Sequence, residues 1–215
     1  MRLYALLEEY AKTNLPDMEI TGLTDDSRKV KPGMLFACIR GEHFDGHSAA
    51  GKALESGAAG CLCSRLPEAL VPGKFYVLVE DTVQALGQVA RAYKAKFPIP
   101  VIGITGSVGK TTTKDMIASV LSQKFRVLKT EGNYNNEIGL PLTLFRLNPQ
   151  HELCVLEMGM NHFGEIDYLT RIVSPNVAVI TNIGDAHIEN LGSREGILKA
   201  KSEIFQAMTG DDLAV

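Results

Sequence analysis

The chain has 215 residues, a hydrophobic content of 45% and a formal net charge of −3. This length and apolar fraction are sufficient for one or two globular domains with cores of their own. The small net charge gives no general attraction to nucleic acid or to an anionic membrane, so we expect small-molecule partners and strictly local recognition of any phosphate.

The cysteines and the first residues indicate a cellular location. No CxxC pair occurs, and Cys38, Cys61 and Cys154 lie inside apolar runs, which predicts buried thiols in a reducing compartment. Residues Met1–Tyr10 read as a short amphipathic helix with acidic residues, unlike a signal peptide, and no apolar run approaches membrane-spanning length. We therefore expect a cytoplasmic protein without membrane insertion.

The first part of the chain alternates short strands and helices. The predicted strands are Met34–Ile39, Gly60–Cys63 and Phe75–Val79, and the predicted helices are Ala49–Ser56 and Val83–Lys96, the second of them capped by Asp81-Thr82. Two prolines in Phe97–Pro100 discourage helix continuation, so we expect a domain boundary there.

Two polar loops follow strands of this first domain. One holds Ser27 and Arg28, and the other runs from Gly41 through His43, Phe44 and Asp45 to His47. Read alone, these residues are more often a turn with surface histidines than a site. Hydroxyl, guanidinium and imidazole groups at strand ends also suit recognition of a uracil ring or a diphosphate.

The segment Val101–Thr113 has the residue types of a phosphate-binding loop. A short apolar strand ends in glycines, and a helical pattern follows, with apolar residues at Met116, Ile117, Val120 and Leu121. Gly106 and Gly109 permit backbone N–H groups to face a polyphosphate, Lys110 could reach the outer phosphates, and Thr111 could bind Mg²⁺. Ile104 stands where the general motif has its first glycine, which leaves a glycine-rich turn as the alternative.

The next elements add candidate ligands. A short strand at Arg126–Lys129 precedes an Asn-rich loop, Thr130–Pro141, that enters a helix through Leu147. Its asparagines either face water or hold a ligand. Glu157 ends the predicted strand Leu153–Glu157, where open α/β sheets bind ligands, and is a candidate Mg²⁺ ligand or else a capping or ion-pairing carboxylate.

The last predicted elements are a helix starting within Gly159–Glu165, a strand at Val177–Thr181, a polar segment Asn182–His187, a helix capped by Ser193 and a new strand within Asp211–Val215. Lys201 falls within the apolar stripe of the Ser193 helix, while Lys199 points to the opposite side. Lys201 could reach solvent, pair with a carboxylate, or become a carbamate beside a metal. Because the chain stops in a strand, we expect a longer natural protein.

The motifs Thr105–Thr111, Gly132–Pro141, Glu157–His162, Asn182–His187 and Lys199–Phe205 together resemble the bacterial Mur ligase family, and the resemblance runs along the whole chain. It implies an α/β fold in which residues 1–97 form a small UDP-binding domain. Residues 98–215 would form the first part of a P-loop ATPase domain with a mostly parallel sheet. A carboxy-terminal ligase domain would be absent from this sequence.

The resemblance also implies roles for individual residues. ATP would be bound by Thr105, Gly106, Ser107, Gly109, Lys110, Thr111 and Thr112, with Asn135 and Asn136 near the phosphates and the substrate. One Mg²⁺ would be held by Thr111 and Glu157, and a second by His187 and a carbamylated Lys201. The implied catalytic residues are Lys110, Glu157, His187 and Lys201. The UDP substrate would contact Ser27, Arg28, Gly41, His43, Phe44 and His47.

The implied activity is an ATP-dependent amide ligase of peptidoglycan precursor synthesis, acting as a monomer. It would join D-alanyl-D-alanine to UDP-N-acetylmuramoyl-tripeptide through an acyl phosphate and release ADP and phosphate. One alternative is a sibling ligase that adds lysine or diaminopimelate to the dipeptide. Another is that the 215 residues alone are a nucleotide-binding module without turnover. A small-molecule kinase would leave the first domain and the Asn-rich loop unexplained.

Overall fold

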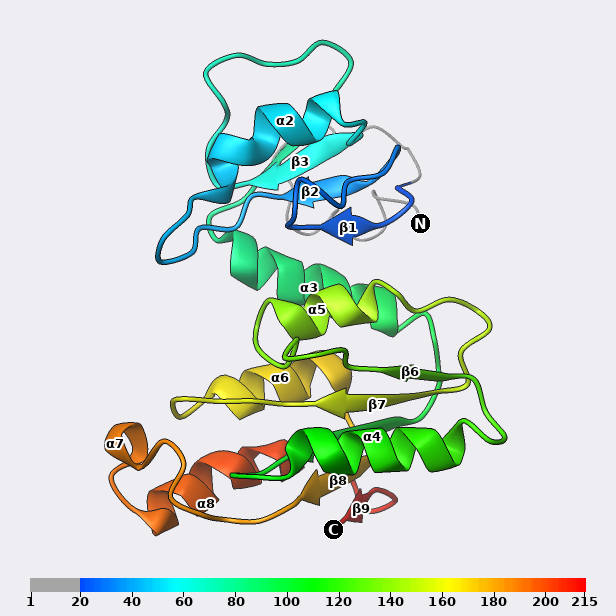
Figure 1. Ribbon diagram of the computed structural model, residues 1–215, viewed down its shortest axis with the longest axis vertical. Helices are drawn as coiled ribbons and strands as arrows, with labels where there is room; N and C mark the ends of the chain where they lie inside the picture. Colours follow the sequence, from blue (N-terminus) through cyan, green and yellow to red (C-terminus); the bar gives the residue numbers. More distant parts are fainter. Residues whose placement is uncertain (1–19) are drawn as a thin grey trace. The chain divides into compact units, whose positions relative to one another are not determined.

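The computed structural model describes residues 20–215 and divides the chain into two compact units, Met1–Ala92 and Tyr93–Val215. Each unit has its own parallel β-sheet with helices packed on it (Figure 1). This confirms the predicted α/β class with mostly parallel sheets. The helix predicted at Met1–Tyr10 lies outside the described residues.

The sheet of the first unit has four parallel strands in sequence order. They are β1 (Leu23–Thr24), β2 (Leu35–Ala37), β3 (Gly60–Cys63) and β4 (Phe75–Leu78). The last three confirm the predicted strands, with ends that differ by at most two residues. Because all strands run in one direction, the loops after β1, β2 and β3 leave the sheet at the same edge.

Helix α2 (Ala50–Glu55), preceded by the 3₁₀ helix η1 (Gly46–Ala49), covers one face of this sheet (Figure 1). Ala53 and Leu54 of α2 pack with Phe36, Cys38 and Cys61 of the strands below. All four cysteines of the chain are free and buried, which confirms the expectation for Cys38, Cys61 and Cys154. Their place in the core follows from small apolar side chains on a sheet face.

Helix α3 (Thr82–Lys94) confirms the predicted helix and its cap. The Asp81 Oδ1 atom accepts hydrogen bonds from the backbone N–H groups of Val83 at 2.8 Å and Gln84 at 3.0 Å, which otherwise lack helical partners. The compact units divide between Ala92 and Tyr93, inside this helix. The boundary predicted at Phe97–Pro100 stays a prediction.

The sheet of the second unit has five parallel strands in the order β6-β7-β5-β8-β9. They are β5 (Val101–Thr105), β6 (Val127–Lys129), β7 (Leu153–Glu157), β8 (Val177–Ile180) and β9 (Leu213–Ala214). The strand predicted within Asp211–Val215 is therefore present. Since β5 lies between β7 and β8, the segments that follow these three strands meet at one edge of the sheet.

Helices cover both faces of this second sheet. They are α4 (Lys110–Leu121), α5 (Gly139–Leu144), α6 (Glu165–Val173), α7 (Ile188–Leu191), α8 (Arg194–Ser202) and the 3₁₀ helix η2 (Glu203–Phe205). Along β5, Ile104 packs with Ala118 of α4, whereas Gly103 faces Ile204 of η2. Burial on both faces explains why the strand reads as a continuous apolar run.

The helix predicted to start within Gly159–Glu165 is confirmed, because α6 begins at Glu165, after Gly164 at a φ of +84°. Two other helix predictions need correction. On α4, Ile117 and Leu121 pack on the core, but Met116 is 65% exposed and Val120 is 71% exposed. The helix that was expected to reach Leu147 ends at Leu144. In the described range 20–215, no helix is long and apolar enough to cross a membrane.

Candidate functional site

The loop between β5 and α4 requires glycine for two separate reasons. Gly106 has a φ of +148°, and a Cβ there would lie 1.9 Å from the Thr181 Oγ1 atom. Gly109, at a φ of +83°, immediately precedes the first residue of α4. Left-handed and extended positive φ values are costly for any residue with a side chain. The two positions predicted as loop glycines thus shape the start of α4.

Residues that follow β8 hold this loop in place. Asn182 accepts a hydrogen bond from the Val108 N–H group at 3.1 Å and donates one to the Val108 carbonyl at 3.1 Å. Thr181 Oγ1 donates to the same carbonyl at 2.7 Å, and the Gly184 N–H group donates to Ser107 Oγ at 2.9 Å. These hydrogen bonds hold the loop in a defined conformation. Sequence reasoning noted Asn182 only as a polar residue at a strand end.

The predicted phosphate-binding lysine lies at the first turn of α4. Its Nζ atom donates to the Gly106 carbonyl at 2.7 Å. Burial lowers the pKa of Lys110, and the nearby Glu157 carboxylate partly opposes that shift. Thr111 and Thr112 are exposed on the same turn, whereas Thr105 is buried and its hydroxyl has no hydrogen-bond partner among residues 20–215.

Glu157 ends β7 and is 2% exposed. One carboxylate oxygen accepts a hydrogen bond from Thr111 Oγ1 at 2.9 Å, and the other accepts one from Asn135 Nδ2 at 2.8 Å. The Glu157 N–H group donates to Thr130 Oγ1 at 2.9 Å, which fixes the backbone as well. The structure thus brings together Thr111, Asn135 and Glu157, three residues predicted for one site.

The donor atoms at this point fit a hard divalent cation. The hydroxyl of Thr111 and the carboxylate of Glu157 already lie side by side, and Mg²⁺ prefers oxygen ligands of this kind. Within residues 20–215, no group of three or more His, Cys, Asp or Glu side chains has the arrangement of a metal site. A cation at Glu157 would therefore depend on oxygen atoms from water or from a bound phosphate.

Lys114 is a buried cation that sequence reasoning missed. Its side chain is 2% exposed, and its Nζ atom lies 3.8 Å from Glu157 Oε2 and 3.7 Å from Asp115 Oδ1. Asp115 in turn accepts a hydrogen bond from Lys129 at 2.7 Å. The available signal was helical spacing, since Lys114 follows Lys110 by one turn and shares its face of α4.

The predicted position of Lys201 is confirmed. Lys201 is 1% exposed on α8, together with the buried Ile197, while Lys199 is exposed with its Nζ atom 5.9 Å from the Phe163 ring centroid. Burial, and then the positive charge of Lys110, lowers the pKa of Lys201 to about 8. This interaction places Lys201 near the phosphate-binding loop. Ser193 caps the helix as predicted.

A second carboxylate supports the segment that carries Lys201. Glu203 is 8% exposed and accepts hydrogen bonds from the Gly164 N–H group, at 2.9 Å to Oε1, and from the Asp167 N–H group at 3.1 Å. It therefore caps the start of α6 from the end of α8. The side chain of Glu203 therefore has a structural role, because it caps α6.

His187 and Asn136, two further predicted ligands, lie at the starts of helices. His187 has a φ of +67° at the start of α7, and among residues 20–215 no hydrogen bond or ion pair joins its imidazole to Lys201. The second metal pair stays a prediction. Asn136 uses its Oδ1 atom to accept a hydrogen bond from the Gly139 N–H group at 2.8 Å, at the start of α5. This helix-capping role was not among the two explanations considered for the asparagines.

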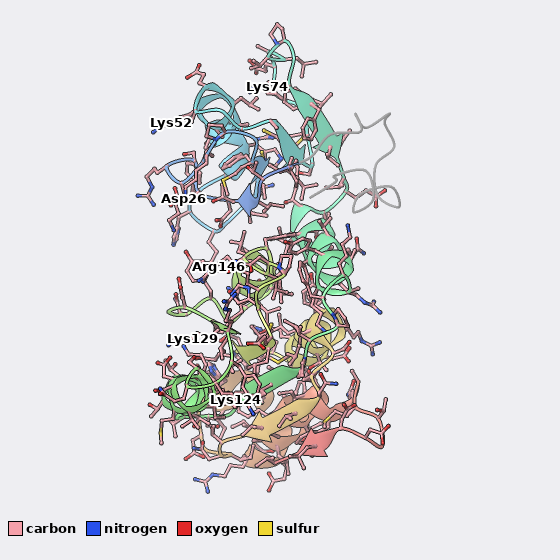
Figure 2. The ribbon with its side chains drawn as sticks, turned by 90° about the vertical axis from the view of Figure 1, so that its right-hand side faces the viewer. Asp26, Lys52, Lys74, Lys124, Lys129 and Arg146 are labelled. Carbon is pink, nitrogen blue, oxygen red and sulfur yellow. The ribbon has the colours of Figure 1, made fainter. Side chains whose placement is uncertain are left out.

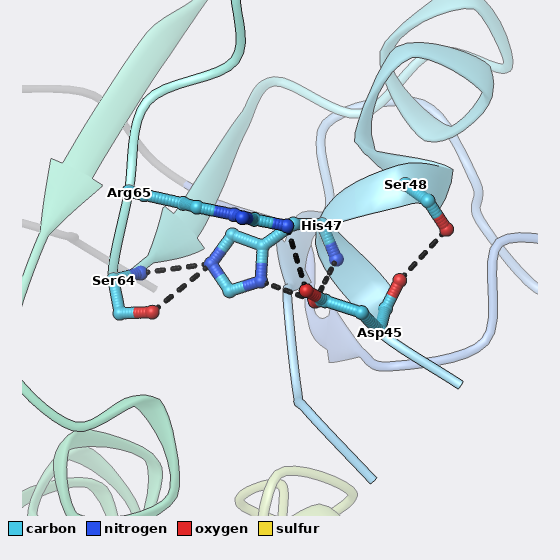
Figure 3. Close-up of polar contacts among 5 residues, drawn as sticks. All are labelled: Asp45, His47, Ser48, Ser64 and Arg65. Carbon is cyan, nitrogen blue, oxygen red and sulfur yellow. Dashed lines mark hydrogen bonds and ion pairs between the residues drawn. The ribbon is translucent and has the colours of Figure 1, made fainter. Parts of the chain in front are cut away.

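In the first unit, His47 joins two loops (Figure 3). Its Nδ1 atom lies 2.6 Å from Asp45 Oδ1, and its Nε2 atom accepts a hydrogen bond from the Ser64 N–H group at 3.0 Å. Arg65 donates to Asp45 Oδ2 at 2.7 Å. The hydrogen bonds from His47 lower the pKa of Asp45. The imidazole is thus a structural link, and only 9% of it is exposed.

This Asp–His–Ser arrangement is not a nucleophilic triad. The Ser64 hydroxyl lies 3.2 Å from His47 Nε2, but the backbone N–H group of Ser64 already donates to that nitrogen. A neutral imidazole has one acceptor nitrogen, so its lone pair is not available to take a proton from the hydroxyl.

The other residues predicted for the UDP substrate lie on the loops after β1 and β2. Arg28 is bound to Asp26 through two hydrogen bonds of 2.9 Å and lowers the pKa of that carboxyl to about 2. Gly41, His43 and Phe44 are exposed, and Ser27 is half-buried. The structure places them on loops at one edge of the sheet, where the Gly41 N–H group donates a hydrogen bond to the Phe44 carbonyl at 2.9 Å. A cavity of about 410 Å³, lined in part by Cys38, His47, Arg65 and Tyr76, lies in the same unit.

Comparison with known families agrees with this architecture. Residues 104–215 match the model of the Mur ligase middle domain, and residues 19–94 match the model described as the Mur ligase family catalytic domain. The first match begins within β5 and covers the phosphate-binding loop, Glu157 and Lys201. The second covers the four-stranded sheet.

Individual relatives are also similar. The chain is 48% identical over 196 residues to the UDP-N-acetylmuramoyl-tripeptide--D-alanyl-D-alanine ligase of Bacillus subtilis, covering 91% of this chain and 43% of that protein. The structure of MurF from Acinetobacter baumannii matches with a TM-score of 0.91 at 38% identity over 99% of this chain and 48% of that one. The structure of the MurF ligase from Thermotoga maritima, in complex with ADP, matches with a TM-score of 0.83 at 37% identity. This match covers 93% of this chain and 46% of that one.

The chain thus spans less than half the length of the curated relatives and solved structures it matches. The similarity nevertheless extends through both units, including the glycine loop, the end of β7 and the end of α8. By its middle-domain match over residues 104–215, the chain belongs to the Mur ligase family.

Proposed function

We propose that the protein containing this chain is an ATP-dependent, ADP-forming ligase of peptidoglycan precursor synthesis. It joins D-alanyl-D-alanine to UDP-N-acetylmuramoyl-tripeptide through an acyl phosphate, in the cytoplasm and as a monomer. The observation that carries the proposal is the contact between Thr111 and Glu157 at 2.9 Å, beside a loop already fixed in shape. The names of the similar proteins supply the substrates.

The second unit would bind ATP. The backbone of Gly106–Gly109 would face the phosphates, Lys110 would exchange its bond to the Gly106 carbonyl for a phosphate oxygen, and Thr112 would lie on the same turn. Thr111 and Glu157 would hold one Mg²⁺, with Asn135 orienting the carboxylate. Bound Mg²⁺ supplies neutralisation of charge where two anionic groups approach each other.

His187 and Lys201 would hold a second Mg²⁺, with Lys201 as its carbamate. The support is the low pKa of Lys201, about 8, because only a neutral amine can react with carbon dioxide. The amino-terminal loops with Ser27, Arg28, Gly41, His43 and Phe44 would contact the uridine end of the substrate. His47 would shape those loops from within, because its ring is already bound to Asp45 and Ser64.

Phosphate release by the full-length protein tests the proposal. We expect turnover with ATP, Mg²⁺, UDP-muramoyl tripeptide and D-alanyl-D-alanine. Turnover only with UDP-muramoyl dipeptide and lysine or diaminopimelate would instead establish the sibling activity. If the protein binds nucleotide but releases no phosphate with either substrate pair, it is a nucleotide-binding module without turnover.

Variants of α8 sharpen the same assay. Lys201→Ala should reduce turnover by at least about a hundredfold, because it removes a proposed ligand of the second Mg²⁺. Lys199→Ala, which removes an exposed lysine of the same helix, should leave turnover nearly unchanged. Equal activity of both variants would remove the metal role from Lys201.

A further inference from the structure

Lys114 is a buried cation to which the proposed function gives no task. It lies on α4 at 2% exposure, and burying an ammonium group is costly unless a carboxylate lies close by. Two carboxylates are within reach, at 3.7 Å for Asp115 and 3.8 Å for Glu157. These contacts decide what the lysine can do.

The two carboxylates differ in what else they bind. Asp115 is 48% exposed in its side chain and already accepts a hydrogen bond from Lys129 at 2.7 Å. Glu157 is 3% exposed in its side chain, and its other partners, Thr111 and Asn135, are neutral. Within residues 20–215, Lys114 is therefore the cation that forms an ion pair with the buried carboxylate proposed to hold Mg²⁺.

Further positive charge surrounds this carboxylate. Lys110 also interacts electrostatically with Glu157. The buried carboxylate thus shares its surroundings with two lysines, Lys114 and Lys110. A divalent cation that arrives alone meets net repulsion, because charges separated by a few ångströms in a partly buried site interact strongly. A polyphosphate brings the negative charge that reverses the balance.

We propose that Lys114 is a positioning residue that acts as the resident counter-ion of Glu157 and keeps the affinity of this carboxylate for a divalent cation low until a nucleotide is bound. The lysine neutralises Glu157 in the nucleotide-free protein. When a nucleotide binds, its phosphates offset the positive charge of the lysines. The cation can then bind to Glu157 and the phosphates, while Lys114 stays beside Glu157. This inference rests on the proposed nucleotide site, and it adds that metal binding is conditional on nucleotide binding.

Titration of the full-length protein with Mn²⁺ tests the proposal, with the EPR signal of the free ion as the readout and no turnover required. In the unaltered protein, Mn²⁺ should bind at least about tenfold more tightly with ADP than without it. Lys114→Met should tighten nucleotide-free binding of Mn²⁺ by about tenfold or more, because it removes a positive charge beside Glu157. Lys114→Arg, which keeps the charge, should behave like the unaltered protein.

Lys124→Met is the matched control, since Lys124 is an exposed lysine just beyond the same helix (Figure 2). It should not change Mn²⁺ binding. A purely structural role for Lys114 predicts that Lys114→Met leaves nucleotide-free Mn²⁺ affinity unchanged or weakens it, and that result would overturn the proposal. Lys114→Gln serves as the second neutral variant if the methionine variant does not fold.

The unaltered protein also provides a test without any substitution. Equal Mn²⁺ affinity with and without ADP would overturn the inference while leaving the nucleotide site in place. Failure to bind ADP at all, measured by calorimetry on the same sample, would instead overturn the proposed function, and the inference with it. The two failures are therefore distinguishable.

Discussion

The two units hold their candidate site residues in different ways. In the second unit, Glu157 accepts hydrogen bonds from Thr111 and Asn135, and Asn182 fixes the glycine loop through Val108. In the first unit, His43 and Phe44 are exposed and Arg28 binds its near neighbour Asp26. The difference agrees with the proposed functions, because neutralising several phosphate charges would require groups fixed in advance, whereas exposed loops could adjust to a substrate when it binds.

Gly106→Ala should have the largest effect, since it displaces the glycine loop from the residues after β8 that hold it. A Cβ would lie 1.9 Å from Thr181 Oγ1, at a φ of +148°. We expect a loss of about 3 kcal/mol or more in the free energy of unfolding, and ADP binding too weak to detect. Urea denaturation and calorimetry measure these quantities.

The control is Gly51→Ala on α2, where a Cβ meets open space. It should leave ADP binding intact and stabilise the protein by up to about 1 kcal/mol, because alanine favours a helix. Retention of ADP binding in Gly106→Ala would show that the loop adjusts to a side chain, and the contrast between the units would then disappear.

Asn182→Ala should have a smaller effect on the conformation of the glycine loop. It removes both hydrogen bonds to the Val108 backbone, at 3.1 Å each, but leaves the bond from Thr181. We expect ADP affinity to fall by about tenfold to thirtyfold, equivalent to about 1.4 to 2 kcal/mol. The Michaelis constant for the UDP substrate should not change. Asn190→Ala, an exposed change on α7, is the control. Equal losses of ADP affinity in both variants would argue against the hydrogen bonds of Asn182 to Val108 as the cause.

Histidine variants should separate structure from recognition in the first unit. His47→Ala removes the links to Asp45 and Ser64 and should lower the free energy of unfolding by about 1 to 2 kcal/mol. His43→Ala, an exposed change, should leave stability unaltered and raise the Michaelis constant for the UDP substrate more than that for ATP. Thermal melts and steady-state kinetics distinguish the two. The reverse pattern would exchange the roles assigned to these histidines.

Lys201 should also make the stability of the second unit depend on pH. Its folded-state pKa is about 8, whereas an unfolded lysine keeps its proton to about pH 10.4. Between these values the unfolded state binds more protons, so the Lys201 contribution makes the folded state more stable as pH rises. Lys201→Met should lose this contribution, and Lys199→Met should keep it. Melting temperatures from pH 7.5 to 10 would reveal the difference, and parallel profiles would contradict the burial of Lys201.

Local patterns explain which parts of the molecule could be predicted. The limits of β7, the Ser193 cap and the buried position of Lys201 all follow from periodicity and capping within one short stretch. The α/β class followed from alternating strands and helices. These features depend on neighbours in sequence, which a single chain displays directly.

Long-range partners explain what could not be predicted. Lys114 looks like an ordinary helix-surface lysine until β7 places Glu157 beside it. The contact between Asn182 and Val108 joins segments that become neighbours only when β8 pairs with β5. Asn136 could have been recognised as a helix cap from its spacing to Gly139, but the nearby asparagines favoured a ligand explanation.

The cap formed by Glu203 gives the second unit a mechanical property. Gly164 has no side chain to cap α6, so a carboxylate from the end of α8 does so in its place. A displacement of α6 along its axis would pull on the segment that carries Lys201. A movement of the loop before α6 would therefore be transmitted to Lys201 through the hydrogen bonds of Glu203. No direct bond between that loop and Lys201 is required.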